Sequence, residues 1–562
     1  MKRESLLWFI LFFLTAVLRL VGLGAAPLAS AEAVQALAAY GAAHGGGVPP
    51  EAQTISPLLF HAHVLLFALF GGGDGLARLL PAFCGIGLAL TPLLLRRYLG
   101  RWGALGSSLL LALSPSLIAL SRSVDGSIPA ALGVMLLVGA VARYLDSWQS
   151  AWIPLGGIGL ALALTAGPAA WGLLLGLVLA LGVGLWVWRE QVAWYWPMLR
   201  PALGRALAAL ALGLFSFGAG LGFHPAGLAA AGEQFLRWLF PGDGYEINFV
   251  LLGASEPLIL LTGIAGAALA LSRRHGMGLL WLFWSLVGFI QWAIGRGGLG
   301  PVLWLVPLAG LGGLAVEGLA RALQRDVRGA AGWVYGALAL TLWAHFGLVL
   351  ARYSRYGNPA DLLLGGIGLA LQALLILLFG VALSVPEGDE TPEAATRRAL
   401  LFVLYRAALA LGVVLLAVTF AAGWRVARVC PGEPACAPGL IPDPVASDLR
   451  RLSEEIGRVR RTLGPGTALW LVDPDPAVAW ALRDVDFQIV PAEQVGRMGN
   501  PTCIVAPAGV SVPEGYYGTA FTLRRAWLSP QAPYQWVRWW LYRDPPSPPP
   551  PADQVILWVR SE

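Results

Sequence analysis

Ionisable side chains recur beside the ends of long apolar segments, and these are the residues of the sequence that could carry out chemistry. A charge next to a lipid bilayer is costly unless it is paired or hydrated, so such residues often mark a site. A carboxylate there can accept a proton from a reacting hydroxyl group, and an arginine fork matches the oxygens of a phosphate. On the side of the membrane that we assign below to the outer face, the set is Glu32, His61, His63, Asp74, Arg78, Arg122, Asp125, Tyr245, Glu246, Glu256 and Arg296.

Most members of this set also have a structural interpretation. Asp74 and Arg78 are four residues apart, a spacing that favours an ion pair at the start of a helix. Arg122 can bind a lipid phosphate or anchor the outer end of a span, and Asp125 can pair with it. Arg296 lies at the outer end of a later span and is a second phosphate candidate.

Glu32 and the two histidines leave several roles open. Glu32 can act as an active-site acid, as a solvated loop residue, or as a charge at the N-terminus of a helix over Ala33 to Tyr40. His61 and His63 are two residues apart and on a helix would point away from each other, so a shared metal ion is not expected. The sequence lacks the phosphate-loop, zinc-protease and nucleophile-elbow motifs of soluble enzymes.

The elements that position these residues are expected to be membrane-spanning helices. Only 12% of the 562 residues are charged, against about a quarter in soluble domains. The mean hydropathy is +0.68, and the 71 glycines suit close packing of helices in a membrane. Apolar runs of about 18 residues or more are candidate spans. The sequence predicts 13 of them, at 6–24, 76–96, 102–120, 126–145, 152–168, 170–188, 203–222, 250–272, 277–295, 300–320, 331–351, 361–384 and 399–422.

The arginine clusters predict the topology. Lys2, the only lysine, and Arg3 place the N-terminus in the cytoplasm, and most arginine clusters then fall on the same side. An odd number of spans puts the tail after Trp424 outside. We therefore expect a multi-pass protein of the plasma membrane, in which the net charge of +6 is a topology signal and not a nucleic-acid surface. A signal peptide ending near Ala31 is the alternative interpretation of the first apolar run.

Two outer segments complete the expected architecture. Residues 25–75 form a loop whose apolar stretch, 58–70, is too short to cross a hydrocarbon core of about 30 Å and is predicted to be an interfacial helix. The transmembrane domain then covers 1–424, and 425–562 form a small α/β domain. Within that domain we expect helices at 448–463 and 534–542 and strands at 467–473, 487–490, 503–506 and 555–559. Cys430 and Cys436 can form a disulfide in an outer compartment, and no nearby histidine supports zinc.

Several sequence runs resemble the GT-C glycosyltransferases. They are Ser56-Pro-Leu-Leu-Phe-His61, Phe70-Gly-Gly-Gly-Asp74-Gly-Leu-Ala-Arg78-Leu-Leu-Pro81, Leu93-Leu-Leu-Arg-Arg-Tyr-Leu-Gly-Arg101 and Leu113-Ser-Pro-Ser-Leu-Ile-Ala-Leu-Ser-Arg122. In the tail they are Ala479-Trp-Ala-Leu-Arg-Asp484, Trp536-Val-Arg-Trp-Trp-Leu-Tyr-Arg543 and Val555 to Arg560. This superfamily includes protein O-mannosyltransferases and aminoarabinose-transferase-like enzymes. The sequence is most similar to a prokaryotic family named for a flippase-activity-associated protein of archaeal N-glycosylation.

The resemblance implies a reaction at the outer membrane face. GT-C enzymes take a sugar from a polyprenyl-phosphate carrier, so a hexose would pass to a glycan or protein acceptor beside membrane lipid, with no nucleic acid involved. The family allows a divalent cation and implies no other cofactor. Its acidic pair in the first outer loop reads Ala31-Glu32 here, which leaves Glu32 as the candidate catalytic acid. The resemblance places Arg122 or Arg296 at the carrier phosphate, and the supporting polar cluster is His61, Asp74, Arg78, Asp125 and Glu256.

The polar motifs of the family are reduced in this sequence. Besides Ala31, a His-Gly-Pro element reads Ile55-Ser56-Pro57, and a Thr-Lys element reads Thr165-Ala166. The same resemblance therefore fits two functions. One is a transferase, with full, reduced or lost activity. The other is a non-catalytic membrane protein that binds a lipid-linked glycan or assists its assembly or flipping. A transporter is disfavoured, because the sequence shows no clear internal repeat.

Overall fold

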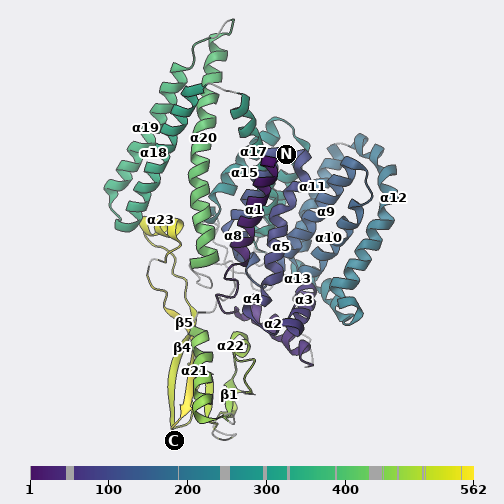
Figure 1. Cartoon of the computed structure of the whole chain (residues 1–562), viewed down its shortest axis with the longest axis vertical. Coiled ribbons are helices and arrows are strands. Elements are labelled where there is room, and N and C mark those ends of the chain that lie inside the picture. Colours follow the sequence, from purple (N-terminus) through teal and green to yellow (C-terminus); the bar gives the residue numbers. More distant parts are fainter. Residues whose placement is uncertain are drawn as a thin grey trace.

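The computed structural model covers the whole chain. The residues that it describes are 2–45, 56–187, 189–240, 253–294, 300–325, 329–386, 389–429, 446, 448–464, 467–495, 499, 501–545 and 547–561. The molecule is elongated, with a large helical body and a small domain that projects from one end and contains the C-terminus (Figure 1).

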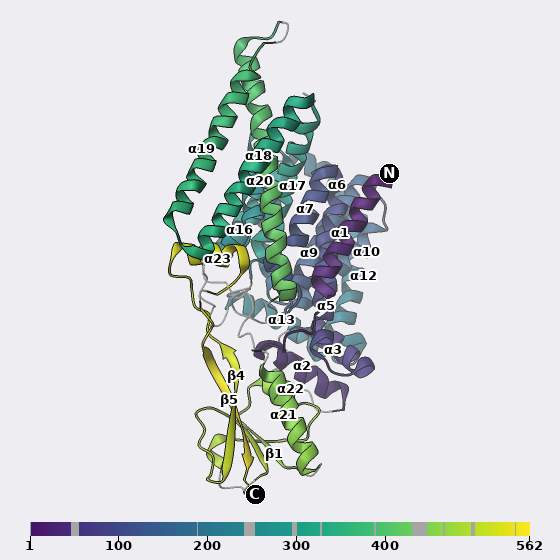
Figure 2. The ribbon, with the colours of Figure 1, turned by 60° about the vertical axis from the view of Figure 1, so that its left-hand side comes forward.

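The helical body is built from helices, most of them long and apolar, that run roughly along the long axis of the molecule (Figures 1 and 2). They are α1 (Lys2–Leu20), α5 (Leu79–Leu90), η2 (Thr91–Leu95), α6 (Arg96–Leu99), α7 (Arg101–Leu113), α8 (Pro115–Ser121), α9 (Ser127–Ser147), α10 (Trp152–Ala166), α11 (Ala169–Val187), α12 (Arg189–Gly213), α15 (Pro257–Ser272), α16 (Gly276–Ala293), α17 (Val302–Arg325), α18 (Gly329–Tyr356), α19 (Pro359–Ala382) and α20 (Pro392–Trp424). Between α12 and α15 lie η3 (Leu214–Gly218), η4 (Gly220–Gly222) and α13 (Ala226–Leu239).

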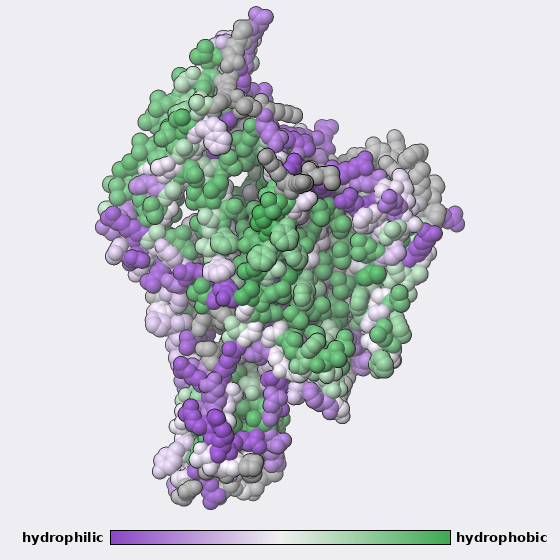
Figure 3. Space-filling view, viewed as in Figure 1, coloured by the Kyte–Doolittle hydropathy of each residue, from purple (hydrophilic) through white to green (hydrophobic). Residues whose placement is uncertain are grey.

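The helical body is consistent with several membrane crossings. Each predicted span overlaps a helix of the body. Among the described residues, seven helices are long and apolar enough to cross a membrane, or eight if the bent pair α7 and α8 is one span. The surface of the body carries a broad hydrophobic area with hydrophilic residues beyond it (Figure 3). These helices indicate a multi-pass membrane protein with at least seven candidate spans among the described residues, and the total of 13 stays a prediction.

The bend between α7 and α8 has a local cause in the sequence Leu113-Ser114-Pro115. Pro115 has no backbone N–H to continue α7 and instead begins α8, where its fixed φ angle is compatible with the first turn. The Ser114 hydroxyl accepts a hydrogen bond from the Leu117 amide at 3.2 Å and so caps α8. The two helices meet at 62°.

The first outer loop contains three helices, α2 (Ser30–Ala43), α3 (Pro57–Phe70) and α4 (Asp74–Ala77). α3 corresponds to the predicted interfacial helix. It begins after Ser56, whose hydroxyl accepts from the Leu59 amide at 3.3 Å, and it ends at Gly71, where φ is +79°. A glycine suits this end because side chains disfavour that conformation.

The C-terminal domain is α/β, as the sequence predicts. Its helices are α21 (Asp448–Leu463), α22 (Pro476–Ala481) and α23 (Pro533–Tyr542). Its strands β1 (Leu469–Val472), β2 (Gln488–Val490), β3 (Cys503–Pro507), β4 (Tyr516–Arg525) and β5 (Pro551–Arg560) form one sheet in the order β2-β1-β3-β5-β4. β1 pairs in parallel with β2 and β3, and β5 pairs antiparallel with β3 and β4. β4 was not predicted from the sequence, because only one of its ten side chains is buried and they show no alternation of buried and exposed positions.

One hydrophobic core joins the first outer loop to the C-terminal domain. Leu28, Ala36 and Phe67 of the loop belong to the same buried cluster as Leu452 and Trp480 of the tail. The tail also returns to the helical body, because α23 packs against α18 and α20. Segments separated by about 400 residues therefore share one core. Whether residue 424 divides two independent domains stays a prediction.

The packing of α15 against α17 generates a first prediction. A Cβ atom added at Gly266 would lie 1.9 Å from the Leu311 carbonyl oxygen, so Gly266→Ala must separate the two helices. We expect a cost of about 1–3 kcal/mol, seen as a lower melting temperature of the detergent-solubilised protein.

The matched control for that change is Gly412→Ala in α20, where no heavy atom lies within 4 Å of the added Cβ. Alanine favours a helix by up to about 1 kcal/mol over glycine, so this melting temperature should stay equal or rise. An equal loss in both variants would contradict the packing explanation.

Candidate functional site

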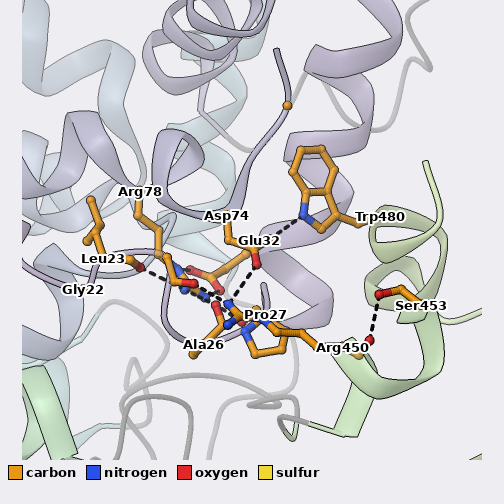
Figure 4. A network of polar contacts seen from close by, with 12 residues as sticks. Gly22, Leu23, Ala26, Pro27, Glu32, Asp74, Arg78, Arg450, Ser453 and Trp480 are labelled. Carbon is orange, nitrogen blue, oxygen red and sulfur yellow. Dashed lines mark hydrogen bonds and ion pairs between the residues drawn. The ribbon is translucent and has the colours of Figure 1, made fainter. Parts of the chain in front are cut away.

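The polar centre of the segment between α1 and α5 is a buried ion pair between Glu32 of α2 and Arg78, which lies between α4 and α5 (Figure 4). Arg78 Nη2 donates to Glu32 Oε2 at 2.6 Å, and Arg78 Nε donates to Glu32 Oε1 at 3.1 Å. Both residues are almost fully buried, with 4% and 6% of their surface exposed. A bidentate pair of this kind is strong and fixes the orientation of both groups.

Backbone amides complete the environment of Glu32. The Ala29 amide donates to Oε2 at 2.8 Å, and the Val124 amide donates to Oε1 at 2.7 Å. The carboxylate thus accepts four hydrogen bonds, two on each oxygen. Four donors on two oxygens hold the carboxylate in one orientation.

Arg78 also organises the chain between α1 and α2. Its Nη1 donates to the Ala26 carbonyl and its Nη2 to the Pro27 carbonyl, both at 2.8 Å. These contacts satisfy carbonyl groups of a buried turn that has no helix partner for them. The ion pair therefore joins three segments that are distant in sequence: the α1–α2 connection, the α4–α5 junction and residue 124.

The predicted i, i+4 pair of Asp74 with Arg78 is wrong, because Arg78 faces Glu32 instead. Asp74 contacts the C-terminal domain: its Oδ1 accepts from Trp480 Nε1 at 2.8 Å, and its Oδ2 lies 3.4 Å from Arg450 Nη2 (Figure 4). Arg450 also donates to the Gly24 carbonyl. Asp74 is therefore one of the contacts between the outer loop and the tail.

Arg122 binds the end of α1. Its Nη1 donates to the carbonyls of Arg19 and Val21, at 3.0 and 3.1 Å, and its Nη2 donates to the Gly22 carbonyl at 2.8 Å. A cation here satisfies carbonyls at the negative end of the helix dipole. Burial lowers the pKa of Arg122 to about 10, so it stays charged at neutral pH. The predicted pairing with Asp125 is replaced by these carbonyl contacts.

Asp125 lies in the turn between α8 and α9, one residue after Val124. Its Oδ1 accepts a hydrogen bond from the Ser127 amide at the start of α9. The residue is half-buried. Burial raises the pKa of the Asp125 carboxyl, and the negative charge of Glu32 adds to that effect. A partly accessible acid with a raised pKa is the type of group that accepts a proton during catalysis.

The two histidines of α3 point to different neighbours. His63 is buried, and its Nε2 lies 2.6 Å from the Ala77 carbonyl oxygen. Burial lowers the pKa of His63 to about 4, so it is neutral at physiological pH. His61 lies between the Phe217 carbonyl, 2.8 Å from its Nδ1, and His224 Nδ1, 3.2 Å from its Nε2. His63 thus holds α3 to α4, and His61 holds α3 to the segment after α12.

Glu256 binds the bend between α7 and α8, and Ser255 next to it contacts the tail. This fully buried carboxylate accepts from the Ser114 hydroxyl at 2.7 Å and from the Ser116 amide at 2.8 Å. Next to it, the Ser255 hydroxyl accepts from Arg543 at the end of α23 at 3.1 Å. Glu256 therefore holds the α7–α8 bend against the start of α15, away from Glu32.

Several predicted residues lie outside the described part of the chain. They are Tyr245, Glu246, Arg296 and the cysteine pair Cys430 and Cys436. The roles expected for Arg296 and for a disulfide therefore stay predictions.

The residues around Glu32 do not suit a divalent cation. Its two oxygens already accept four hydrogen bonds, and the guanidinium of Arg78 supplies the neighbouring positive charge. Within the described ranges, no group of three or more His, Cys, Asp or Glu side chains is arranged to hold a metal ion.

A cavity of about 460 Å³ lies in the C-terminal domain beside the outer loop. It opens at the carboxyl ends of β1 and β3, the place where open α/β sheets bind ligands. Asp475 and Arg524 form an ion pair in its wall, and the Ser30 hydroxyl of α2 donates to Asp475 at 2.8 Å. Arg524 also pairs with Asp553 at 2.8 Å. These groups can donate to and accept from the hydroxyls of a sugar or peptide.

Sequence analysis missed some residues of these sites. Asp475 has a readable signal, since Asp followed by Pro476 is a typical helix start, and Asp475 indeed caps α22. Trp480 and Arg524 have no comparable local signal, because Asp74 and Ser30, their partners in the first outer loop, lie more than 400 residues away in the sequence.

The fold that surrounds this polar centre is that of the GT-C glycosyltransferases. ArnT, the aminoarabinose transferase of Cupriavidus metallidurans, solved with undecaprenyl phosphate bound, is similar over 98% of this chain and 98% of its own, with a TM-score of 0.53 and 16% identity. Its apo structure gives a TM-score of 0.51 at 16% identity, over 89% of this chain and 93% of that one.

A weaker match comes from the oligosaccharyltransferase of Archaeoglobus fulgidus, tethered with an acceptor peptide. Its TM-score is 0.43 at 14% identity, over 85% of this chain and 63% of that one. No protein-family model matches the sequence. No curated protein matches it significantly either.

The Glu32–Arg78 ion pair generates a second prediction. Removing one member of a buried pair leaves an uncompensated charge and costs about 3–5 kcal/mol. We expect Glu32→Ala and Arg78→Ala each to lose this much, and the double variant to lose clearly less than the sum. The measurement is a double-mutant cycle on the free energy of unfolding in detergent.

The control cycle uses the exposed pair Glu455–Arg458 of α21, which are 2.8 Å apart. An exposed pair of this kind contributes less than about 1 kcal/mol. If the two cycles gave the same coupling energy, the buried pair would not organise the outer face.

Proposed function

We propose that the protein is a membrane glycosyltransferase of the GT-C type, which transfers a hexose from a polyprenyl-phosphate carrier to an acceptor at the outer membrane face. The observation that carries the proposal is Asp125: a partly accessible carboxyl with a raised pKa beside the buried pair of Glu32 and Arg78. Likeness in fold to a transferase solved with undecaprenyl phosphate, over nearly the full length of both chains, supports it.

In the proposed reaction, Asp125 removes the proton from a hydroxyl or amide of the acceptor as that group attacks the anomeric carbon. The bond from that carbon to the carrier phosphate oxygen breaks, which releases the polyprenyl phosphate. A base on the face opposite the phosphate suits transfer with inversion. We assign Glu32 to positioning, because its carboxylate is bound to Arg78 and two amides. Through the Val124 amide it fixes the turn that carries Asp125.

The leaving phosphate requires a cation. Arg122 and Arg296 remain candidates, although both terminal nitrogens of Arg122 donate to the end of α1. Arg428 is an additional candidate. It is exposed, it lies close enough to Arg122 to lower that residue's pKa, and a Cβ added at Gly22 would lie 3.0 Å from its Nη1. We place the acceptor near the cavity lined by Asp475 and Arg524.

A second function is favoured by Ala31. This residue stands where the resemblance places the first acid of a pair, and an alanine cannot accept a proton. Under this alternative the protein binds a lipid-linked glycan, or assists its assembly or flipping, without turnover.

Asp125→Asn tests the proposed base. The amide keeps the shape of the side chain but cannot accept the proton, so we expect kcat to fall about 10²- to 10⁴-fold while binding of the carrier persists. The assay uses purified protein with polyprenyl-phosphate hexoses. Asp486→Asn, at an exposed position of the tail, is the matched control and should keep full activity.

The variant Ala31→Asp separates the two functions. Turnover by the natural chain supports the transferase. Carrier binding without turnover, together with activity that appears only in Ala31→Asp, supports the non-catalytic function and contradicts the role given to Asp125.

The raised pKa of Asp125 predicts a pH dependence. The base works only when deprotonated, so kcat/KM should fall as the pH drops through this pKa. Because the fold raises the pKa above its ordinary value of 3.8, the acid limb should lie at a higher pH than a solvated aspartate would give. A pH–rate profile measures the limb, and the residual activity of Asp125→Asn should lack it. A limb that persists in Asp125→Asn would belong to another group.

A further inference from the structure

A second cavity, of about 760 Å³, lies in the helical body and plays no part in the proposed reaction. It is formed where the C-terminal ends of α15 and α17 meet the N-terminal end of α20. The far end of α20 leads toward the C-terminal domain, so this cavity lies at the opposite end of the helical body from the polar centre at Glu32 (Figure 1).

Positive charge dominates the wall of this cavity. Arg273 closes α15, Arg321 belongs to α17, and Arg397 and Arg398 belong to α20, whereas Glu393 is the single acid of the lining. Three helices thus direct four guanidinium groups to one cavity. Like charges gathered at one place raise the local concentration of anions.

The acids behind the wall compensate only part of this charge. Arg321 pairs with Glu317 at 2.7 Å, and Arg398 pairs with Glu390 at 3.0 Å. For Arg273 and Arg397, both exposed, the described part of the chain supplies no ion pair. These two side chains can therefore turn to a ligand without breaking an internal contact.

The first turn of α20 adds a backbone donor. Thr391, Glu393 and Ala394 line the same cavity, at the start of a helix of 33 residues. The Thr391 hydroxyl accepts from the Ala394 amide at 3.3 Å and Pro392 has no N–H, so within the first turn the Glu393 amide is left without a helical acceptor. A helix N-terminus beside guanidinium groups favours a compact anion.

The rest of the wall indicates where such an anion comes from. Leu401 and Phe402 of α20 contribute an apolar side to the cavity. Leu400 and Leu404 are exposed on the same helix, which is long and apolar enough to cross a membrane. A basic site with an apolar side at a membrane end suits a lipid head group whose chains continue along the helix.

We propose that the cavity lined by Arg273, Arg321, Arg397 and Arg398 is a binding site for a phosphate-bearing anion, with an anionic phospholipid head group or free phosphate as the source. Guanidinium forks bind phosphate oxygens in pairs, which a solvated chloride cannot reproduce. The site is independent of the proposed transfer reaction, and it ties α15 and α17 to α20 through the ligand.

The test measures binding to the full chain in nanodiscs of phosphatidylcholine. Trace cardiolipin or phosphatidylglycerol is titrated in one arm, and inorganic phosphate or pyrophosphate in the other, with retained adducts counted by native mass spectrometry. In the double variant Arg273→Gln with Arg397→Gln, we expect the affinity for the anion to fall about tenfold or more, since each basic residue near a membrane surface contributes about 1 kcal/mol.

Two further variants exclude a general effect of charge or folding. Arg200→Gln with Arg205→Gln removes the same charge from exposed positions of α12 and should leave binding unchanged. Arg273→Lys with Arg397→Lys keeps the charge without the forks and should restore only part of the affinity. Melting temperatures confirm that each variant is folded.

Each outcome decides the proposal. Selective retention of the anionic lipid by the natural chain, lost in the glutamine variant, supports a lipid site. Retention of inorganic phosphate with the same loss supports a site for a soluble phosphate. Equal anion binding by the natural chain, the pocket variant and the α12 control overturns the proposal.

Discussion

The arrangement of the segment between α1 and α5 depends on one buried ion pair. Glu32 and Arg78 satisfy each other and, between them, the backbone groups of Ala29, Val124, Ala26 and Pro27. An unpaired charge at either position would be buried at a cost of several kcal/mol, so the two residues and the segments they hold must come together at once. The pair fixes where α2 begins, where α5 begins, and how the turn before α9 is oriented.

The pair also affects the C-terminal domain. Once Arg78 is bound to Glu32, Asp74 four residues earlier is available to Trp480 and Arg450 of the tail. The tail then completes the hydrophobic core of α2 and α3, two short helices that could not bury their apolar faces alone. The segment with α2 and α3 and the C-terminal tail therefore form one folded unit from the two ends of the chain. Its stability is therefore coupled to the packing of the spans between them.

The proposed chemistry depends on a difference among the carboxylates: some are buried and hold elements in place, and one is partly accessible. Glu32 accepts four hydrogen bonds and Glu256 binds the α7–α8 bend, so both are buried and hold elements in place, whereas Asp125 sits in a turn and is partly accessible. The arginines can be divided in the same way, by whether their partners lie within the protein. Those that cap carbonyls or pair with buried acids are structural, and those at cavity walls, such as Arg273 and Arg397, remain open to ligands.

Local sequence determined much of the architecture. Apolar run length predicted the helices of the body, the short stretch at 58–70 predicted α3, and the periodicity of the tail predicted α21, α23 and four of the five strands. These features arise from hydrophobic burial and backbone hydrogen bonding, which act over neighbouring residues. β4 was not predicted because its side chains show no alternation of buried and exposed positions, and it is stabilised by pairing with β5.

Tertiary structure alone decided which polar residues are partners. Spacing predicted Asp74 with Arg78 and Arg122 with Asp125, and both pairings are wrong, because each arginine found a better acceptor brought to it by another segment. A charged side chain in a poorly hydrated place pairs with the complementary group that lies nearest to it in the folded structure. The separation of the two residues in the sequence does not matter. The sequence by itself therefore predicted that Glu32, Arg78, Arg122 and Asp125 lie at one face of the membrane. The fold determined that Glu32 is bound by Arg78 and two amides and that Asp125 stays partly accessible.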